Sequence, residues 1–316
     1  MKLGIVIPCY NEQEVLKETC DRLLALLDRM SNKQKISADS KIYCVDDGSK
    51  DKNWELINSL ASTNKQIAGI KLSRNFGHQN ALLAGVFTVN EDAIVSIDAD
   101  LQDDITVIED MVDQHLSGID IVYGVRNCRK TDTRFKRWTG EAFYRLMKVL
   151  GVDIVFNHAD YRLLSRQAID ALKEFREVNL FLRGIVPLIG FSSSNVYYER
   201  VERFAGESKY PLMKMISFAL EGITSFSVTP LRIITAIGII VFLLSLAMTA
   251  YILSVKLLSG GAVPGWASTV LPVYLLGGIQ IFCIGIIGEY LGKIYKETKA
   301  RPRYIMEKVI NLKKTQ

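Results

Sequence analysis

The sequence predicts an α/β fold in which a mostly parallel central sheet is followed by two membrane-spanning helices. Short apolar runs alternate with amphipathic stretches through roughly the first 165 residues. Polar residues directly follow five of the apolar runs, and two long uncharged stretches occupy the second half of the chain. Alternating strands and helices are typical of a parallel sheet with both faces covered.

Five strands and four intervening helices are expected in the first half of the chain. The strands are expected at residues 3–8, 41–47, 67–73, 93–100 and 120–126. The helices are expected at residues 14–30, 54–62, 79–88 and 105–117. Runs of this kind predict consecutive strand–helix units. We expect them to form one cytosolic domain over residues 1–210.

Polar residues gather where the predicted strands end. In parallel sheets of this kind, ligands bind beyond the carboxyl ends of the strands. Those ends carry residues 8–12, 46–49, 73–77 and 98–100, and Arg126. Five polar strand ends on one edge indicate a binding site, whereas a single one would indicate a turn.

Asp98-Ala99-Asp100 is the most informative of these strand ends. Two carboxylates at i and i+2 can both face one cation, and a diphosphate needs such a cation to offset its charge. An Asp-x-Asp sequence also closes many strands in a turn, so the pattern by itself leaves both interpretations open.

The second half of the chain contains two candidate membrane spans. Residues 233–255 and 257–288 carry no charge, and a spanning helix needs roughly 20 apolar residues. Within a membrane unit over residues 231–295, helices are expected at about 233–255 and 269–291. One lysine lies between the spans, whereas basic residues flank their outer ends, which predicts that both ends are cytoplasmic.

The flanking segments have separate predictions. Residues 211–230 are expected to form a juxtamembrane interfacial helix, with packing against the globular domain as the alternative. Residues 296–316 are expected to form a basic cytosolic tail. The five cysteines are scattered, which indicates reduced thiols in a cytosolic body. The net charge of +5 is mild, and nucleic acid is not an expected partner.

Several motifs, taken in order, resemble those of a family 2 glycosyltransferase with the GT-A fold. They are IVIPCYNE, VDDGSKD, Arg-Asn-x-Gly-x-x-x-Ala, DADLQDD, YRLLSR and ERFAGESKY. With the two spans, the whole chain resembles the bacterial polyprenyl-phosphate glycosyltransferases. That branch includes the bactoprenol glucosyltransferases and is related to the dolichyl-phosphate mannose synthases. The resemblance implies a GT-A nucleotide-sugar-binding domain.

The resemblance implies a set of residues that bind the nucleotide-sugar donor. They are Pro8, Tyr10, Glu12, Asp46, Asp47, Asp98, Arg203 and Lys209. The residues of the first two strand ends match positions that contact the nucleoside. Arg203 and Lys209 match a loop that closes over the diphosphate and offsets its charge. A basic loop that touches anionic lipid is the alternative for those two residues.

The resemblance also implies Asp100 as a direct ligand of Mg²⁺ or Mn²⁺, with Gln102 as a second ligand. Asp160 matches a catalytic carboxylate of many family 2 enzymes. Because a phosphate acceptor is already anionic near neutral pH, Asp160 is expected either to act as a base or to orient the acceptor or a basic residue.

The acceptor phosphate is expected to bind arginines after the fifth strand. Arg126, Arg134 and Arg137 match this role, which suits the fork of the guanidinium. Asp98, Asp160, Arg126 and Arg137 form the implied catalytic set. Glu141 departs from the related mannose synthases, which carry a small hydroxyl residue there, and this weakens the assignment.

Other polar residues receive structural interpretations. Arg74 is expected to pair with an acidic strand end or with a phosphate, and His78 is interpreted as structural. Asp103 and Asp104 are expected to begin the next helix, where negative charge is favourable. Arg162 is expected to pair locally.

The implied reaction transfers one hexose from UDP-glucose to undecaprenyl phosphate, by a metal-dependent displacement with inversion. The Gln-x-x-Arg-Trp motif of processive synthases is absent from residues 179–184, which favours transfer of a single sugar. One alternative is a different donor, such as mannose or an amino sugar. Another is a non-catalytic membrane scaffold or flippase component.

The implied location is the bacterial inner membrane, with the bilayer and the lipid acceptor as partners. A homo-oligomer is expected, because glycines at 277, 278, 285 and 288 permit close helix contact. Two spans make a poor conduit for a sugar. A separate flippase and a downstream transferase are therefore expected, with the product serving surface polysaccharide or O-antigen modification.

Overall fold

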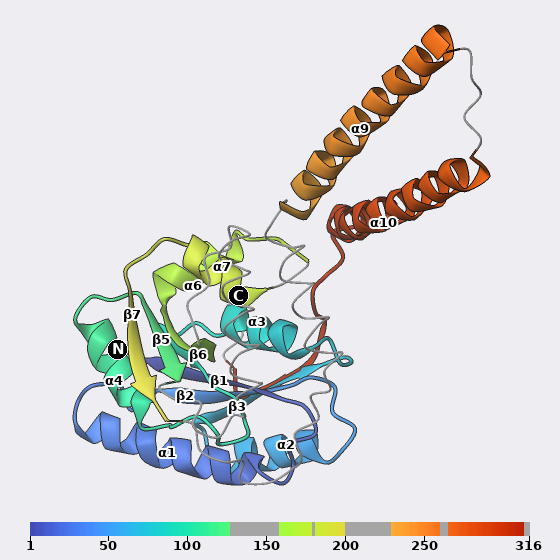
Figure 1. Cartoon of the computed structure of the whole chain (residues 1–316). Helices are drawn as coiled ribbons and strands as arrows, with labels where there is room; N and C mark the ends of the chain where they lie inside the picture. Colours follow the sequence, from blue (N-terminus) through green and yellow to red (C-terminus); the bar gives the residue numbers. More distant parts are fainter. Residues whose placement is uncertain (127–157, 179–180, 200–228, 260–264, 313–316) are drawn as a thin grey trace.

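The structure is a computed structural model that describes residues 1–126, 158–178, 181–199, 229–259 and 265–312. Among these residues, one eight-stranded sheet has the strand order β7-β5-β6-β4-β1-β2-β3-β8 (Figure 1). The strands are β1 (Leu3–Cys9), β2 (Lys41–Asp46), β3 (Ile67–Leu72), β4 (Ala93–Ser96), β5 (Ile121–Arg126), β6 (His158–Ser165), β7 (Ser193–Tyr198) and β8 (Met306–Ile310). The helices are α1 (Leu16–Asn32), α2 (Asn53–Thr63), α3 (His78–Thr88), α4 (Val107–Leu116), α6 (Arg166–Lys173), α7 (Leu182–Leu188), α9 (Thr229–Ser259) and α10 (Trp266–Thr298).

Most neighbouring strands run parallel, as the sequence predicts. β1 is parallel to β2 and β4, β2 is parallel to β3, and β5 is parallel to β7. β6 lies between β4 and β5 and is antiparallel to both. The α/β fold is confirmed, and the five predicted strands begin within one residue of their expected positions. β4 ends at Ser96 rather than at residue 100, because the residues beyond it leave the sheet to form a loop.

Helices cover both faces of the sheet. α1, α2 and α4 pack on one face and α3, α6 and α7 on the other (Figure 1). Within β1, Ile5 and Ile7 belong to the first core and Val6 to the second, because successive strand residues point to opposite faces. Burial of each such side chain contributes about 1.5–3 kcal/mol, so uninterrupted apolar strands are stabilised from both sides.

The C-terminal segment differs from the basic tail predicted for residues 296–316. Its strand β8 pairs antiparallel with β3 and extends the sheet by one strand. The Ser73 backbone N–H donates to the Ile305 carbonyl at 2.9 Å, and the Asn311 amide donates to the Ile67 carbonyl at 2.9 Å. β8 has five residues and is largely exposed. An exposed strand needs no continuous apolar run, and the sequence of β8 therefore lacks the pattern that marks the other strands.

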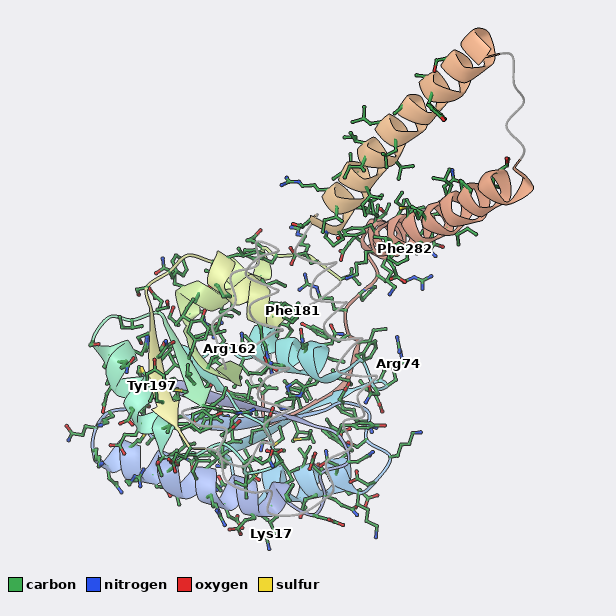
Figure 2. All side chains as sticks on the ribbon, in the orientation of Figure 1. Lys17, Arg74, Arg162, Phe181, Tyr197 and Phe282 are labelled. Atoms are coloured by element: carbon green, nitrogen blue, oxygen red, sulfur yellow. The ribbon has the colours of Figure 1, made fainter. Side chains whose placement is uncertain are left out.

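Helices α9 and α10 project from the domain as a hairpin (Figure 1). Large apolar side chains remain exposed on both, among them Leu244 at 62%, Ile281 at 74% and Phe282 at 67%. Figure 2 labels Phe282 on α10, away from the sheet. In the part of the chain that the structure describes, no helix has the length and apolar character needed to cross a membrane. The predicted interfacial helix at 211–230 lies outside the described residues, except for two residues at the start of α9.

The end of α10 is fastened to the domain by polar contacts. The Glu297 carboxylate accepts from the Val178 backbone N–H at 2.8 and 3.0 Å. Beyond the helix, Arg303 donates to the Phe175 carbonyl. Both partners lie in the segment after α6, so the base of the hairpin is held beside that segment.

Candidate active site

The candidate site lies at one edge of the sheet, where five parallel strands end. β1 to β4 run parallel, and β5 shares their direction because β6 is antiparallel to both β4 and β5. The loops that carry the predicted segments therefore leave from the same edge. The sequence correctly predicted this common edge.

The loops after β1 and β2 are joined by hydrogen bonds. The Asn11 backbone N–H donates to Ser49 Oγ at 3.0 Å, and the Lys50 N–H donates to Asn11 Oδ1 at 2.8 Å. Asn11 has a φ of 56°, a left-handed conformation in which asparagine is enriched. The predicted donor residues Tyr10 and Glu12 flank Asn11, so this junction determines where they lie.

Asp46 and Asp47 are buried and bind other parts of the protein. Asp46 Oδ1 accepts from Asn53 Nδ2, at the start of α2, at 2.7 Å. The Asp47 carboxylate accepts from the backbone N–H groups of Phe76 at 2.7 Å and Gly77 at 2.9 Å. Burial raises the pKa of Asp47, and these two hydrogen bonds oppose that rise. Both aspartates therefore hold the loops around the predicted donor site.

Gly48 lies where the loop after β2 meets the loop after β3. Its φ is +65°, and a Cβ there would lie 2.4 Å from the Arg74 carbonyl carbon and 2.6 Å from the Asn75 nitrogen. These are backbone atoms, which cannot move aside cheaply. We expect Gly48→Ala to lower the free energy of unfolding by about 2–4 kcal/mol, from backbone strain and overpacking together. Thermal melting of the purified chain measures this loss.

The matched control for that prediction is Gly118→Ala. Gly118 also has a positive φ, +102°, but an added Cβ meets nothing within 4 Å. The Gly118→Ala variant therefore has backbone strain but no steric overlap, and its free energy of unfolding is expected to fall by about 1 kcal/mol. Equal destabilisation of the two variants would show that the close approach at Gly48 does not constrain the fold.

The acidic loop, residues 97–104, follows β4 and is tightly folded. Leu101 has a φ of 55°, an unusual conformation for a residue with a branched side chain. The Gln102 N–H donates to Asp100 Oδ1 at 3.2 Å, and the Thr19 hydroxyl of α1 donates to a carbonyl of the loop at 2.8 Å. Such strained backbone is common at functional sites, where the surrounding structure holds it.

Asp98 and Asp160 approach each other, with His78 beside both. His78 Nε2 lies 3.4 Å from Asp98 Oδ1 and 3.8 Å from Asp160 Oδ2. Partial burial raises the pKa of Asp98, and the carboxylates of its neighbours raise it further, whereas His78 opposes the rise. His78, interpreted from the sequence as structural, lies beside two of the predicted catalytic carboxylates.

Asp160 is also held by two arginines. Arg162 Nη2 lies 2.6 Å from Asp160 Oδ1, and Arg183 Nη2 lies 3.6 Å from Asp160 Oδ2. The predicted local pairing of Arg162 is therefore confirmed. Its side chain is only 2% exposed, and its position inside the domain is labelled in Figure 2. The two arginines fix the orientation of the Asp160 carboxylate, which suits the orienting role expected from the sequence.

Arg126 is fixed by two buried side chains, one from the acidic loop and one from the end of β7. Its Nη2 lies 3.3 Å from Asp103 Oδ1, and its Nε donates to the Tyr198 hydroxyl at 3.2 Å. The Tyr198 hydroxyl in turn donates to Asp103 Oδ1 at 2.5 Å. Asp103 was expected to begin a helix, but α4 starts later, at Val107, and Asp103 instead faces Arg126.

The acidic loop fits a divalent cation that is shared with a diphosphate. Within the described ranges, no group of three or more His, Cys, Asp or Glu residues is arranged to hold a metal ion by itself. Mg²⁺ is usually bound through one or two carboxylates together with substrate phosphates. Besides burial, the nearby carboxylates of Asp103, Asp160 and Asp100 raise the pKa of Asp98. A cation at this edge would relieve that repulsion.

Comparison with known proteins identifies the family. Residues 4–173 match glycosyl transferase family 2, and residues 229–294 match the GtrB C-terminal hairpin. The chain belongs to glycosyl transferase family 2. The glycosyltransferase is 51% identical over 307 residues to the uncharacterized glycosyltransferase YkoT of Bacillus subtilis, covering 96% of this chain and 91% of that protein.

Two further comparisons extend this result. The glycosyltransferase is 40% identical over 310 residues to the prophage bactoprenol glucosyl transferase homolog of Escherichia coli K12, covering 98% of this chain and 99% of that protein. Among solved structures, a Mycobacterium tuberculosis glucosyl-3-phosphoglycerate synthase is similar at a TM-score of 0.46 and 17% identity, covering 71% of this chain and 77% of that one. The family matches and the relatives confirm the enzyme class and the GT-A fold that the motifs predict.

Some predicted site residues of the glycosyltransferase are not placed by the structure. Arg134, Arg137, Arg203 and Lys209 lie outside the described residues. Pro8 is buried within β1.

Two polar residues near the site, Arg74 and Asp104, have partners within the protein. The Arg74 Cζ lies 4.2 Å from the centroid of the Phe76 ring, and no ion pair joins Arg74 to an acidic residue in the described part of the chain. Asp104 accepts from the Thr106 N–H at 2.9 Å, three residues before α4, and thus supports the helix start as predicted.

Three residues at the site were not predicted from the sequence: His78, Arg183 and Tyr198. His78 directly follows the Arg-Asn-x-Gly segment, so its position in the chain was a usable signal. Arg183 and Tyr198 lie on α7 and β7, outside the motifs that carried the resemblance. The pairing of β7 with β5 brings Tyr198 to the site, whereas Arg183 reaches it on helix α7.

Proposed function

We propose that this glycosyltransferase transfers one glucose from UDP-glucose to undecaprenyl phosphate. The observation that carries the proposal is the match to the Escherichia coli bactoprenol glucosyl transferase homolog, over 98% of this chain. The match spans the catalytic domain and the hairpin, so both parts support the same activity. The absence of a Gln-x-x-Arg-Trp motif at residues 179–184 supports transfer of a single sugar.

The donor diphosphate binds at the acidic loop in this proposal. Asp100 and Gln102 would hold Mg²⁺ or Mn²⁺, which would supply positive charge for the departing diphosphate. Asp98 contacts the sugar or the nucleotide. Arg203 and Lys209 contribute further positive charge beside the diphosphate.

The acceptor phosphate attacks the anomeric carbon in line with the departing diphosphate, which inverts that centre. Arg126, Arg134 and Arg137 hold the phosphate, so their contribution is mainly one of position. No strong base is required, because the phosphate is already anionic near neutral pH. Asp160 orients the site, since Arg162 holds its carboxylate at 2.6 Å.

The hairpin anchors the enzyme in the bacterial inner membrane in this proposal. Residues 233–255 and 257–288 carry no charge, and each exceeds the roughly 20 residues of a span. Large apolar side chains are exposed on α9 and α10, which suits contact with lipid. The basic residues after the second stretch support a cytoplasmic location for both ends and for the catalytic domain.

The product would be a polyprenyl-phosphate sugar on the cytoplasmic leaflet. A separate flippase and a downstream transferase are needed to move and use that sugar outside the membrane. The glycines of α10 permit close packing between hairpins, and a homo-oligomer is part of this proposal for that reason.

A donor panel tests the proposal directly. Purified enzyme in detergent is incubated with undecaprenyl phosphate and radiolabelled UDP-glucose, UDP-galactose, GDP-mannose or UDP-N-acetylglucosamine, with and without EDTA. We expect lipid-linked label from UDP-glucose only, loss of the product with EDTA, and recovery with added Mg²⁺ or Mn²⁺. If lipid-linked label comes from a different donor only, the sugar of that donor replaces glucose in the proposed reaction. No lipid product from any donor would favour a non-catalytic scaffold.

A further inference from the structure

Three side chains, Asp103, Arg126 and Tyr198, form a hydrogen-bonded cluster at the side of the site where the acceptor phosphate is proposed to bind. Asp103 comes from the acidic loop, Arg126 from the end of β5 and Tyr198 from the end of β7. Asp103 and Tyr198 are 4% and 3% exposed, whereas the Arg126 side chain is 24% exposed. The two buried members therefore cannot serve as surface groups, and Arg126 is the member that reaches solvent.

The sheet itself brings Arg126 and Tyr198 together. β5 and β7 are parallel, and Arg126 is the register partner of Tyr198 at the last position of the pairing. Tyr198 is held from its other side by Tyr161, whose ring meets it edge-on with centroids 5.4 Å apart. The Tyr161 hydroxyl donates to the Asp104 carbonyl at 2.9 Å, which fixes the acidic loop against the same pair of rings.

The hydrogen bonds fix the orientation of the guanidinium. Arg126 donates from Nε to the Tyr198 hydroxyl at 3.2 Å and from Nη2 to Asp103 at 3.3 Å. Tyr198 also donates to the same Asp103 oxygen, at 2.5 Å. Contacts at two different nitrogens prevent the planar group from rotating freely. Hydrogen bonds to charged groups are stronger than bonds between neutral groups. They hold the Arg126 guanidinium in one orientation before the phosphate binds, so little conformational entropy is lost on binding.

We propose that Asp103 and Tyr198 are positioning residues that hold the Arg126 guanidinium in place for the phosphate of the lipid acceptor. This inference rests on the proposed function, in which Arg126 binds that phosphate. Asp103 and Tyr198 are buried, so in this proposal they act on the phosphate through Arg126. Asp103 also directly follows Gln102, so the loop that holds the donor diphosphate and the arginine that holds the acceptor are joined by one side chain.

The test is the Tyr198→Phe variant of the full-length enzyme, assayed with undecaprenyl phosphate and UDP-glucose. Removing the hydroxyl frees Nε of Arg126 from its partner and leaves the ring packing intact. We expect the KM for undecaprenyl phosphate to rise about 10-fold, as for loss of one hydrogen bond to a charged group. The KM for UDP-glucose should change less than about twofold, because the donor contacts remain.

The matched control is Tyr161→Phe. It also removes a buried tyrosine hydroxyl beside the acidic loop, but that hydroxyl bonds a carbonyl and not Arg126. Its acceptor KM should stay within about twofold of the parent enzyme. If both variants raise the acceptor KM equally, the effect of Tyr198 is general loosening of the loop, and the proposal is wrong.

A double-variant cycle with Arg126→Lys shows whether Tyr198 acts through Arg126. Arg126→Lys alone should raise the acceptor KM, and adding Tyr198→Phe to it should raise the KM no further. Additive effects would overturn the positioning role. Asp103→Asn, which removes the charge but keeps an acceptor oxygen, repeats the cycle if Tyr198→Phe folds poorly by thermal melting.

The same cycle separates this inference from the proposed function. If Arg126→Lys leaves the acceptor KM unchanged, the assignment of Arg126 to the acceptor fails, and the positioning role fails with it. If Arg126→Lys raises the KM but Tyr198→Phe and Asp103→Asn do not, the proposed function stands and only the positioning role is wrong.

Discussion

Replacing Asp100 by alanine is expected to lower the rate of glucose transfer by about 10²- to 10³-fold. Asp100 lies in the acidic loop beyond β4, where the carboxylates crowd together and a diphosphate needs positive charge. Loss of one group that stabilises developing charge in a transition state commonly has an effect of this size. The measurement is the initial rate of lipid-linked label from UDP-glucose, at saturating acceptor and over a range of Mg²⁺ concentrations.

The control for Asp100→Ala is Asp104→Asn, four residues further along the same loop. Asp104 accepts from the Thr106 backbone N–H at 2.9 Å and from its hydroxyl at 2.7 Å, and an asparagine oxygen can accept both bonds. We expect this variant to keep activity within about twofold of the parent. Undiminished product formation by Asp100→Ala, at all Mg²⁺ concentrations, would remove Asp100 from the metal site.

The strand ends could be predicted from the sequence because the relevant signals are local. Each apolar run and the polar residues after it are adjacent in the chain, and parallel strands bring such ends to one edge. Asp98, Asp100 and Gln102 lie in a single loop, so no long-range pairing had to be inferred to place them together. The structure bears out the common edge for this reason.

The second layer of the site depends on pairing that a local pattern does not encode. Asp160 reaches Asp98 and His78 only because β6 enters the sheet antiparallel between β4 and β5. Tyr198 reaches Arg126 only through the register of β5 with β7, which are separated by more than 60 residues. Strand β8 likewise follows the hairpin and returns to β3 over a long distance in the chain.

The chemistry of a carboxylate also limited the prediction at Asp46 and Asp47. A nucleoside and a backbone N–H offer the same kind of hydrogen bond, so a polar strand end fits either partner. In the structure, Asp47 accepts from two backbone N–H groups of the β3–α3 loop. A motif residue can therefore be needed at a donor site because it shapes the loops around it.

The Asp160→Asn variant is expected to lower the free energy of unfolding by about 3–5 kcal/mol. The Arg162 side chain is 2% exposed and lies 2.6 Å from Asp160. Its other hydrogen bond in the described structure is a weak one, to the Leu182 carbonyl at 3.4 Å, and its Nε has no partner there. Breaking a buried ion pair on one side leaves an uncompensated charge, which accounts for the size of the loss. Thermal melting of the detergent-solubilised enzyme measures it.

A second substitution separates the stability of this pair from its role in the reaction. The cavity beside Arg162 is lined by apolar side chains, among them Leu82, Leu164 and Leu182. Arg162→Met should suit these surroundings, so the double variant with Asp160→Asn should recover at least half of the lost stability. Failure to recover would show that the cavity cannot accept an apolar replacement and that the cost lies elsewhere.

The activity of the double variant then decides what Asp160 contributes. If the carboxylate orients the site through His78 and Arg183, which lie 3.8 and 3.6 Å from it, a stable enzyme without it should still be slow, by about 10- to 100-fold in kcat. If Asp160 served only to neutralise Arg162, the double variant would regain the parent rate, because neither charge remains. A stable but slow enzyme therefore supports the orienting role, and a stable and fast one contradicts it.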